Sequence, residues 1–265
     1  MLHVFIGLGP GRTSRPFDAM SARVTLDPNL PPQTEPLRRL EKATTELNSF
    51  YWTFKCALEF MLPAVRGVDR VTDLVTSAAG SQLNISSAQF TAESEGTKRI
   101  ARHSLLVLSV TAFEDYLKDA LSIFLIRNWK PEKTYKIAFK PQDLPPPAEV
   151  EAWLRGKAIA AVVDEHMSRS YSDRLKAISK LITDYGGNAP ALPLDIQALA
   201  AQACEARNNI VHASGTIDAR AADALRSVVP GIKAGDRLNI EEPLLWQFLG
   251  SLRDSARAVD VQIRS

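Results

Sequence analysis

The stretch SLLVLSVTAFEDYL, residues 104–117, is the most hydrophobic run of this 265-residue chain and decides how the rest must fold. Apolar residues recur in it every three or four positions, and the same pattern extends over residues 97–129. The main apolar face consists of Leu106, Val110, Phe113, Leu117, Ala120 and Phe124, and it is widened by Leu105, Leu108, Ala112 and Ile123. Apolar surface around most of the circumference predicts a central helix that several other elements bury.

The segments on either side of this central helix also have helical spacing, interrupted by Pro and Gly. Helices are predicted over residues 34–63, 148–167, 170–186, 194–213, 218–229 and 241–263, with a weaker one over 68–79. Loops are predicted over 80–96 and 131–147, and a turn or hairpin over 230–240. The sequence therefore predicts an all-α fold, a helical bundle of six or seven helices with long connections, as a single domain over residues 35–265.

Residues 1–34 contain five prolines and no periodicity, so they are expected to form a disordered or extended N-terminal arm. Met20 offers an alternative start of the chain. The longest apolar run is about half of the roughly 20 residues that a membrane-spanning helix needs. The first residues also lack the basic region of a signal peptide, so a soluble cytoplasmic protein is expected.

The composition narrows the function classes. With 45% hydrophobic residues and a net charge of +2, the chain has no strongly basic field, so any nucleic-acid contact must come from a local patch. The two cysteines, Cys56 and Cys204, match no metal-binding spacing and are expected to be reduced.

The candidate functional stretch is RNNIVH, residues 207–212, which closes the helix predicted over 194–213. The spacing of Arg207 and His212 alone is near the chance rate, so the context must decide. A stripe of apolar residues on this helix is expected to face the core: Leu199, Ala203, Ala206 and Ile210. Arg207 lies on the flank of that stripe, and Asn208 and His212 lie on the opposite face.

Arg207 and His212 are separated by about 140° on an ideal helix, so they cannot easily hold one phosphate together. This geometry favours a homodimer in which a second chain completes the site. The residue types suit RNA cleavage without a metal. His212 can transfer protons near neutral pH, Arg207 can bind a phosphate, and Asn208 can orient either group. No acidic cluster with His stands at ligand spacing, so no metal and no cofactor are expected.

The pattern Arg-polar-x-x-x-His at a helix end resembles the signature of HEPN domains, in particular the RiboL-PSP-like branch. Residues 101–121 resemble the earlier core helix of that branch. The Arg–His stretch, then Gly215 and Asp218, then residues 234–240 and a closing helix follow in the same order. The resemblance covers about residues 97–264, leaves out the N-terminal arm, and says little about residues 35–96.

The resemblance implies a dimer with facing Arg–His helices and a metal-independent endoribonuclease that leaves a 2′,3′-cyclic phosphate. Such enzymes act in toxin–antitoxin, RNA-processing or phage-defence settings, which adds RNA and an antitoxin or regulatory protein as expected partners. Arg207 and His212 are then the catalytic pair, Asn208 is the polar residue after the Arg, and Glu114 is a possible acidic support. Ser214 departs from the wider family, in which some toxins carry a nucleotidylated Tyr two residues after the His, so this mode of neutralisation is not expected.

Simpler interpretations stand beside this one. A His near a helix C-terminus is commonly a favourable cap, and an exposed Arg is commonly a solvated charge. Since some HEPN proteins are inactive, the alternative is a non-catalytic helical module that binds RNA, a nucleotide or a protein. An accessible His212 favours the enzyme, whereas a buried or salt-bridged Arg207 or His212 favours the module. His103 is expected to be a satisfied core histidine.

Overall fold

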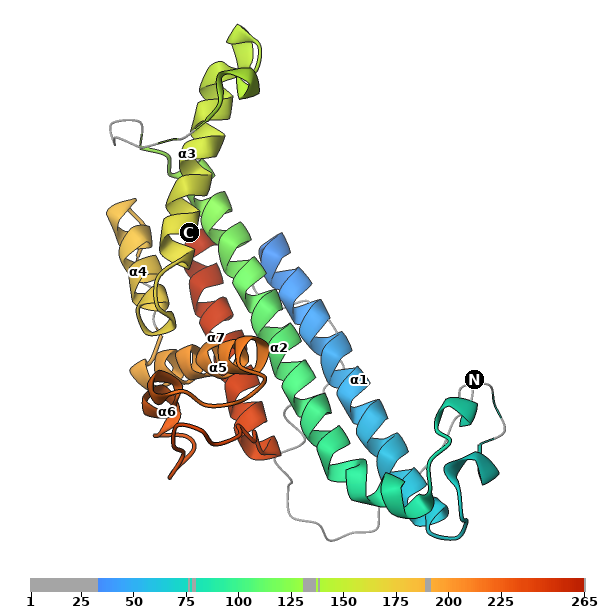
Figure 1. Ribbon diagram of the computed structural model, residues 1–265. Helices are drawn as coiled ribbons and strands as arrows, with labels where there is room; N and C mark the ends of the chain where they lie inside the picture. Colours follow the sequence, from blue (N-terminus) through green and yellow to red (C-terminus); the bar gives the residue numbers. More distant parts are fainter. Residues whose placement is uncertain are drawn as a thin grey trace, which may run out of the picture. The chain divides into compact units, whose positions relative to one another are not determined.

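The computed structural model describes residues 33–264 except 76, 78–79, 131–136, 138 and 189–191. The arm predicted over 1–34 thus lies outside the described residues, apart from Gln33 and Thr34, which belong to the helical unit. The described residues contain no strand, only two isolated β-bridges, so the all-α prediction is confirmed. The seven α-helices are α1 (Glu35–Val65), α2 (Ser87–Arg127), α3 (Val150–Met167), α4 (Tyr171–Asp184), α5 (Leu194–His212), α6 (Ala219–Leu225) and α7 (Glu242–Arg264) (Figure 1).

Helix α2 is the centre of the helical unit, as its apolar pattern predicts. It lies beside α1 along much of its length, α7 packs on it, and α5 crosses both α2 and α7 (Figure 1). Its fully buried side chains meet those of α7 in one core, which includes Leu106, Val110, Leu117, Leu121, Leu125, Leu245 and Phe248. None of the described helices has the combination of length and apolar character needed to cross a membrane.

The N-terminal half of α2 corrects the predicted boundaries. The helix begins at Ser87, not at residue 97, because the Ser86 hydroxyl caps it by accepting a hydrogen bond from the Gln89 amide at 3.2 Å. Gly96 therefore lies inside a helix, at a cost of about 1 kcal/mol relative to Ala. The weaker α-helix predicted over 68–79 is also wrong, since the described part of that segment contains only a 3₁₀ turn, Val71–Asp73.

The start of α1 is fixed to the end of α7. Thr34 caps α1, and its hydroxyl also donates to the carboxylate of Asp260, which is fully buried. Asp260 pairs in turn with Arg264, with 2.9 Å between Nε and Oδ2. A buried carboxylate needs such partners, so this contact joins the first and last described helices.

Candidate functional site

The C-terminal end of α5 is held by Asn209. Its backbone carbonyl accepts hydrogen bonds from the amides of Ala213 and Gly215, at 3.0 and 3.2 Å. Its side-chain Nδ2 donates to the Thr216 carbonyl at 2.9 Å. The chain then leaves the helix through Ser214 and Gly215, at φ 51° and 79°, a left-handed conformation that often ends helices. His212 is thus the last helical residue, at a closely fixed helix end.

The buried face of α5 is wider than the predicted stripe. Leu199 and Ile210 pack against the core as predicted, although they are only partly buried, and Ala203 and Ala206 are buried. Ala200, Cys204 and Asn209 are buried as well. The buried arc is wide because α2, α4 and α7 all pack against α5.

The predicted catalytic residues lie on different sides of α5. His212 is exposed and Asn208 is half-buried. Arg207 is half-buried, and its Nε is fully enclosed without an acceptor. Within the described chain, neither Arg207 nor His212 forms an ion pair. On an ideal helix the two side chains are about 140° apart, so in one chain they point in different directions.

Glu114 lies close to Arg207 but pairs with another arginine. Arg174 of α4 donates from Nη1 to Glu114 Oε1 of α2 at 2.6 Å, and these two side chains are only 11% and 17% exposed. The Arg174 guanidinium also stacks over the Tyr171 ring, 4.5 Å from its centre. We call these residues, together with Cys204 and Arg207 of α5, the Glu114 cluster.

The charge of Arg207 acts on the pKa values of Cys204 and Tyr171, as do the charges of Glu114 and Arg174. Burial raises the pKa of the Cys204 thiol to about 12, and the charge of Glu114 adds to the rise, while Arg174 and Arg207 oppose it. Burial and Glu114 also raise the pKa of Tyr171, and the same two arginines again act in the opposite direction. Cys204 and Tyr171 are thus neutral near pH 7, and Arg207 acts on the same groups as Glu114 and Arg174 without pairing with Glu114.

A groove of about 440 Å³ runs along the outer face of α5, between the first turns of α4 and helix α6. Its lining includes Ala198, Ala201 and Glu205 of α5 and Tyr171 of the Glu114 cluster. The next residues on the same face of α5, at helical spacing from 201 and 205, are Asn208 and His212. The groove therefore leads along the helix toward the exposed imidazole.

Sequence reasoning missed Arg174 and Asn209. Arg174 has no local signal, because its partner Glu114 is 60 residues earlier in the chain. Asn209 is inside the Arg–His stretch, but its burial depends on the turn that follows α5. In the described segments, no three His, Cys, Asp or Glu side chains come together in a way that would hold a metal ion.

Comparisons with known proteins add no relative: no protein-family model, no curated protein and no solved structure matches this chain.

Proposed function

We propose that this chain is a metal-independent endoribonuclease of the HEPN type, with Arg207 and His212 as its catalytic residues. The observation that supports this best is the state of these two side chains. His212 is exposed at the end of α5, and Arg207 has no carboxylate paired with it in the described structure, although Glu114 is nearby. Both groups are therefore available to a substrate, as an enzyme requires.

The proposed reaction is attack of a ribose 2′-oxygen on the adjacent phosphorus. The O2′–P bond forms, the P–O5′ bond breaks, and the products are a 2′,3′-cyclic phosphate and a free 5′-hydroxyl. The neutral imidazole of His212 accepts the 2′-OH proton, and the imidazolium that results gives a proton to the leaving 5′-oxygen. Arg207 stabilises the charge on the pentacoordinate phosphorus through two parallel N–H donors. Asn208 precedes His212 by one turn on the same face and would orient its ring.

We also propose that a second copy of the chain completes the site. Arg207 and His212 lie about 140° apart around α5, so one phosphate is out of reach of both in a single chain. A two-fold axis next to the end of α5 would bring the Arg207 of one chain to the His212 of the other. Two such sites would then be present per dimer.

RNA cleavage in the presence of EDTA tests the activity. His212→Ala and Arg207→Ala should each reduce the cleavage rate by about 100- to 10,000-fold, the usual contribution of a proton-transferring or charge-stabilising group. His166→Ala is the matched control, because His166 is a half-buried histidine on α3, with Nδ1 2.8 Å from the Val162 carbonyl. Equal rates in all four proteins would end the catalytic proposal and favour the non-catalytic binding module.

Mixing the two inactive variants tests the shared site. In a mixed dimer of Arg207→Ala and His212→Ala chains, one of the two composite sites keeps both functional residues. Random pairing makes half of the dimers mixed, so the mixture should regain about a quarter of the wild-type rate. No recovery, with dimers present, would contradict a site shared in this way.

A further inference from the structure

A second group of arginines lies on α2, away from the Glu114 cluster. Arg102 and His103 follow Arg99 by three and four residues, so both are its neighbours on the helix surface. Arg237 comes from the segment before α7, in which Leu238 and Ile240 are buried while Arg237 and Asn239 are exposed. Arg102 Nη2 donates to Asn239 Oδ1 at 3.3 Å, which holds this segment against α2. We call Arg99, Arg102 and Arg237 the arginine patch.

Carboxylates of the described chain lie beside the arginine patch, but none of them is ion-paired with it. None of its three guanidinium groups forms an ion pair with any residue that the structure describes. The nearby carboxylates already have partners: Glu95 pairs with Lys98 at 2.7 Å, and Glu242 pairs with Lys55 at 2.7 Å. Glu241 accepts a hydrogen bond from Asn239 at 2.5 Å.

The pKa of His103 reflects the positive charge of the arginine patch. Burial lowers its pKa to about 4, and the charges of Arg99, Arg102 and Arg237 contribute to the fall. Its Nε2 and the Nε of Arg102 are both enclosed without an acceptor. The prediction of a satisfied core histidine is therefore wrong, since His103 is half-buried and one ring nitrogen has no partner.

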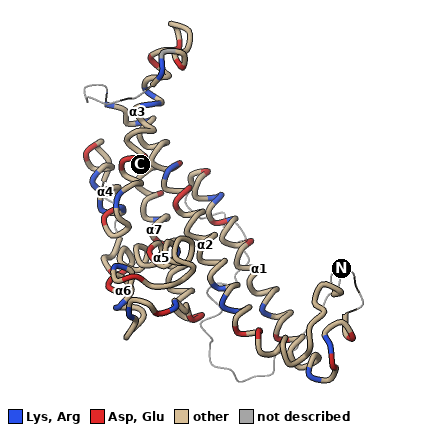
Figure 2. Tube along the Cα trace, in the orientation of Figure 1, with Lys and Arg blue, Asp and Glu red and all other residues tan. Residues whose placement is uncertain are grey.

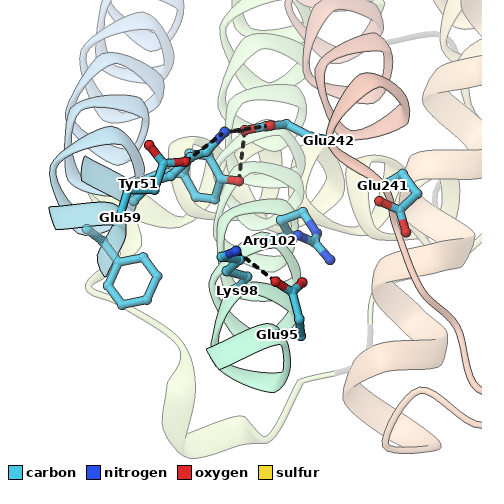
Figure 3. Close-up of a pocket in the computed structure, with 9 residues that line it drawn as sticks. Tyr51, Glu59, Glu95, Lys98, Arg102, Glu241 and Glu242 are labelled. Carbon is cyan, nitrogen blue, oxygen red and sulfur yellow. Dashed lines mark hydrogen bonds and ion pairs between the residues drawn. The ribbon is translucent and has the colours of Figure 1, made fainter. Parts of the chain in front are cut away.

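A cavity of about 250 Å³ lies next to the patch, between α1, α2 and the start of α7. Figure 3 shows Tyr51 bonded to Glu242, Lys98 bonded to Glu95, and Arg102 without a dashed contact. Glu242 also pairs with Lys55. Arg102 thus lines this open space without a direct ion pair in the described chain, although Glu59, Glu95, Glu241 and Glu242 line it too. The wider surface has mixed charges along every helix (Figure 2), so a local group of this kind is what a chain of net charge +2 would need to bind a polyanion.

The patch is connected directly to the end of α5. Arg237 forms a β-bridge with Thr216, four residues beyond His212. The Leu238 amide donates to the Gly215 carbonyl at 2.7 Å. Since Asn209 binds this same turn, hydrogen bonds connect the segment of Arg237 to the end of α5 that bears His212.

We propose that the arginine patch binds the phosphodiester backbone of an RNA strand beside the cleavage site. Guanidinium groups bind phosphate oxygens through paired N–H donors, and no carboxylate of the described chain is ion-paired with the patch. The identity of the strand as RNA rests on the proposed function. The patch positions the substrate and takes no part in proton transfer.

The test measures binding separately from cleavage. In a His212→Ala background, anisotropy of a labelled single-stranded RNA is followed as salt increases. Arg99→Gln with Arg237→Gln should weaken binding about tenfold at low salt and reduce the slope of log K against log salt by about 1.4, or 0.7 per lost contact. Arg102 is left intact because it holds Asn239.

The matched control removes two positive charges elsewhere. Arg38 pairs with Glu35 in the first turn of α1, and Arg127 donates to the Ile263 carbonyl at the far end of α2. On an ideal helix, Arg127 is about 42 Å from Arg99. Arg38→Gln with Arg127→Gln should leave the salt slope unchanged. An equal loss in this control, or no change in the patch variant, would overturn the proposal.

The two proposals can fail separately. If the wild type cleaves RNA but the patch variant binds as tightly as its parent, the patch is wrong and the ribonuclease stands. If the wild type does not cleave RNA yet binding depends on Arg99 and Arg237, the ribonuclease is wrong and the patch stands.

Discussion

Two arginines belong to the Glu114 cluster, and their partners differ. Arg174 donates to Glu114 at 2.6 Å and stacks on Tyr171, so its charge is used inside the fold. Arg207 is half-buried as well, yet no carboxylate of the described chain pairs with it. The difference shows that burial alone does not separate a structural arginine from one that can bind a ligand. The presence or absence of a counter-ion does.

The largest expected effect comes from Arg174→Met. It leaves the Glu114 carboxylate buried without a partner, so the free energy of unfolding should fall by about 3 to 5 kcal/mol. Adding Glu114→Gln removes the unpaired charge and should restore part of the loss. Denaturant unfolding of the single and double variants measures this. Equal stability of the two variants would mean that Arg174 is not a structural partner of Glu114.

Arg207→Lys should separate activity from stability. Lysine keeps the positive charge but loses the two parallel donors, so cleavage should slow by about 100-fold, or about 2.7 kcal/mol in the barrier. The thermal unfolding midpoint should stay close to that of the wild type, because no ion pair is broken. A clear drop in the midpoint would instead place Arg207 with Arg174 as a structural residue.

Because the arginines around His103 lower its pKa, the stability of the fold should depend on pH. The folded pKa of about 4 lies below the ordinary value of 6.5, so as the pH falls from 6.5 toward 4 the unfolded chain gains a proton that the folded chain does not. Stability is therefore complete above pH 6.5 and declines through this window. The loss should be on the order of 1 kcal/mol, because half-buried charges are screened. His103→Gln should remove this part of the pH dependence in denaturant unfolding, and an identical profile would contradict it.

The smallest effect is on thiol reactivity. In a Cys56→Ser background, which removes the exposed cysteine, only Cys204 can react. Its pKa of about 12 keeps it protonated and unreactive at pH 8. Arg174→Met should accelerate its alkylation by opening the cluster, whereas Arg207→Lys should not. Equal alkylation rates in the two variants would contradict the claim that Arg174, and not Arg207, is the structural arginine.

The central part of the fold could be predicted from the sequence because helical periodicity is a local property. The apolar face around Leu106, Val110 and Leu117 identified α2 as the buried helix. The start of α2 could not be placed, since residues 87–96 are polar and only the cap at Ser86 defines the boundary. A polar helical segment of this kind is stabilised by packing against neighbouring elements, and the sequence of the segment itself does not show that packing.

For the site, periodicity predicted the outward position of Asn208 and His212 and their separation from Arg207. It did not predict which helices would enclose α5, so the burial of Cys204 and Asn209, on either side of the apolar stripe, was not foreseen. The contact between Glu114 and Arg174 joins α2 to α4. The two residues are 60 positions apart in the sequence, so their contact depends on tertiary packing. The catalytic roles of Arg207 and His212 stay predictions until cleavage is measured.

One consequence follows from the unbroken course of α2. His103 and Glu114 are eleven residues apart, which on an ideal helix turns them by only about 20° and sets them about 16 Å apart along the axis. The helix thus fixes the distance between the arginine patch and the Glu114 cluster. Each inserted or deleted residue would change that spacing by about 1.5 Å and twist one group by about 100° against the other. In homologous sequences, insertions and deletions should therefore occur in the connections between helices and not between His103 and Glu114.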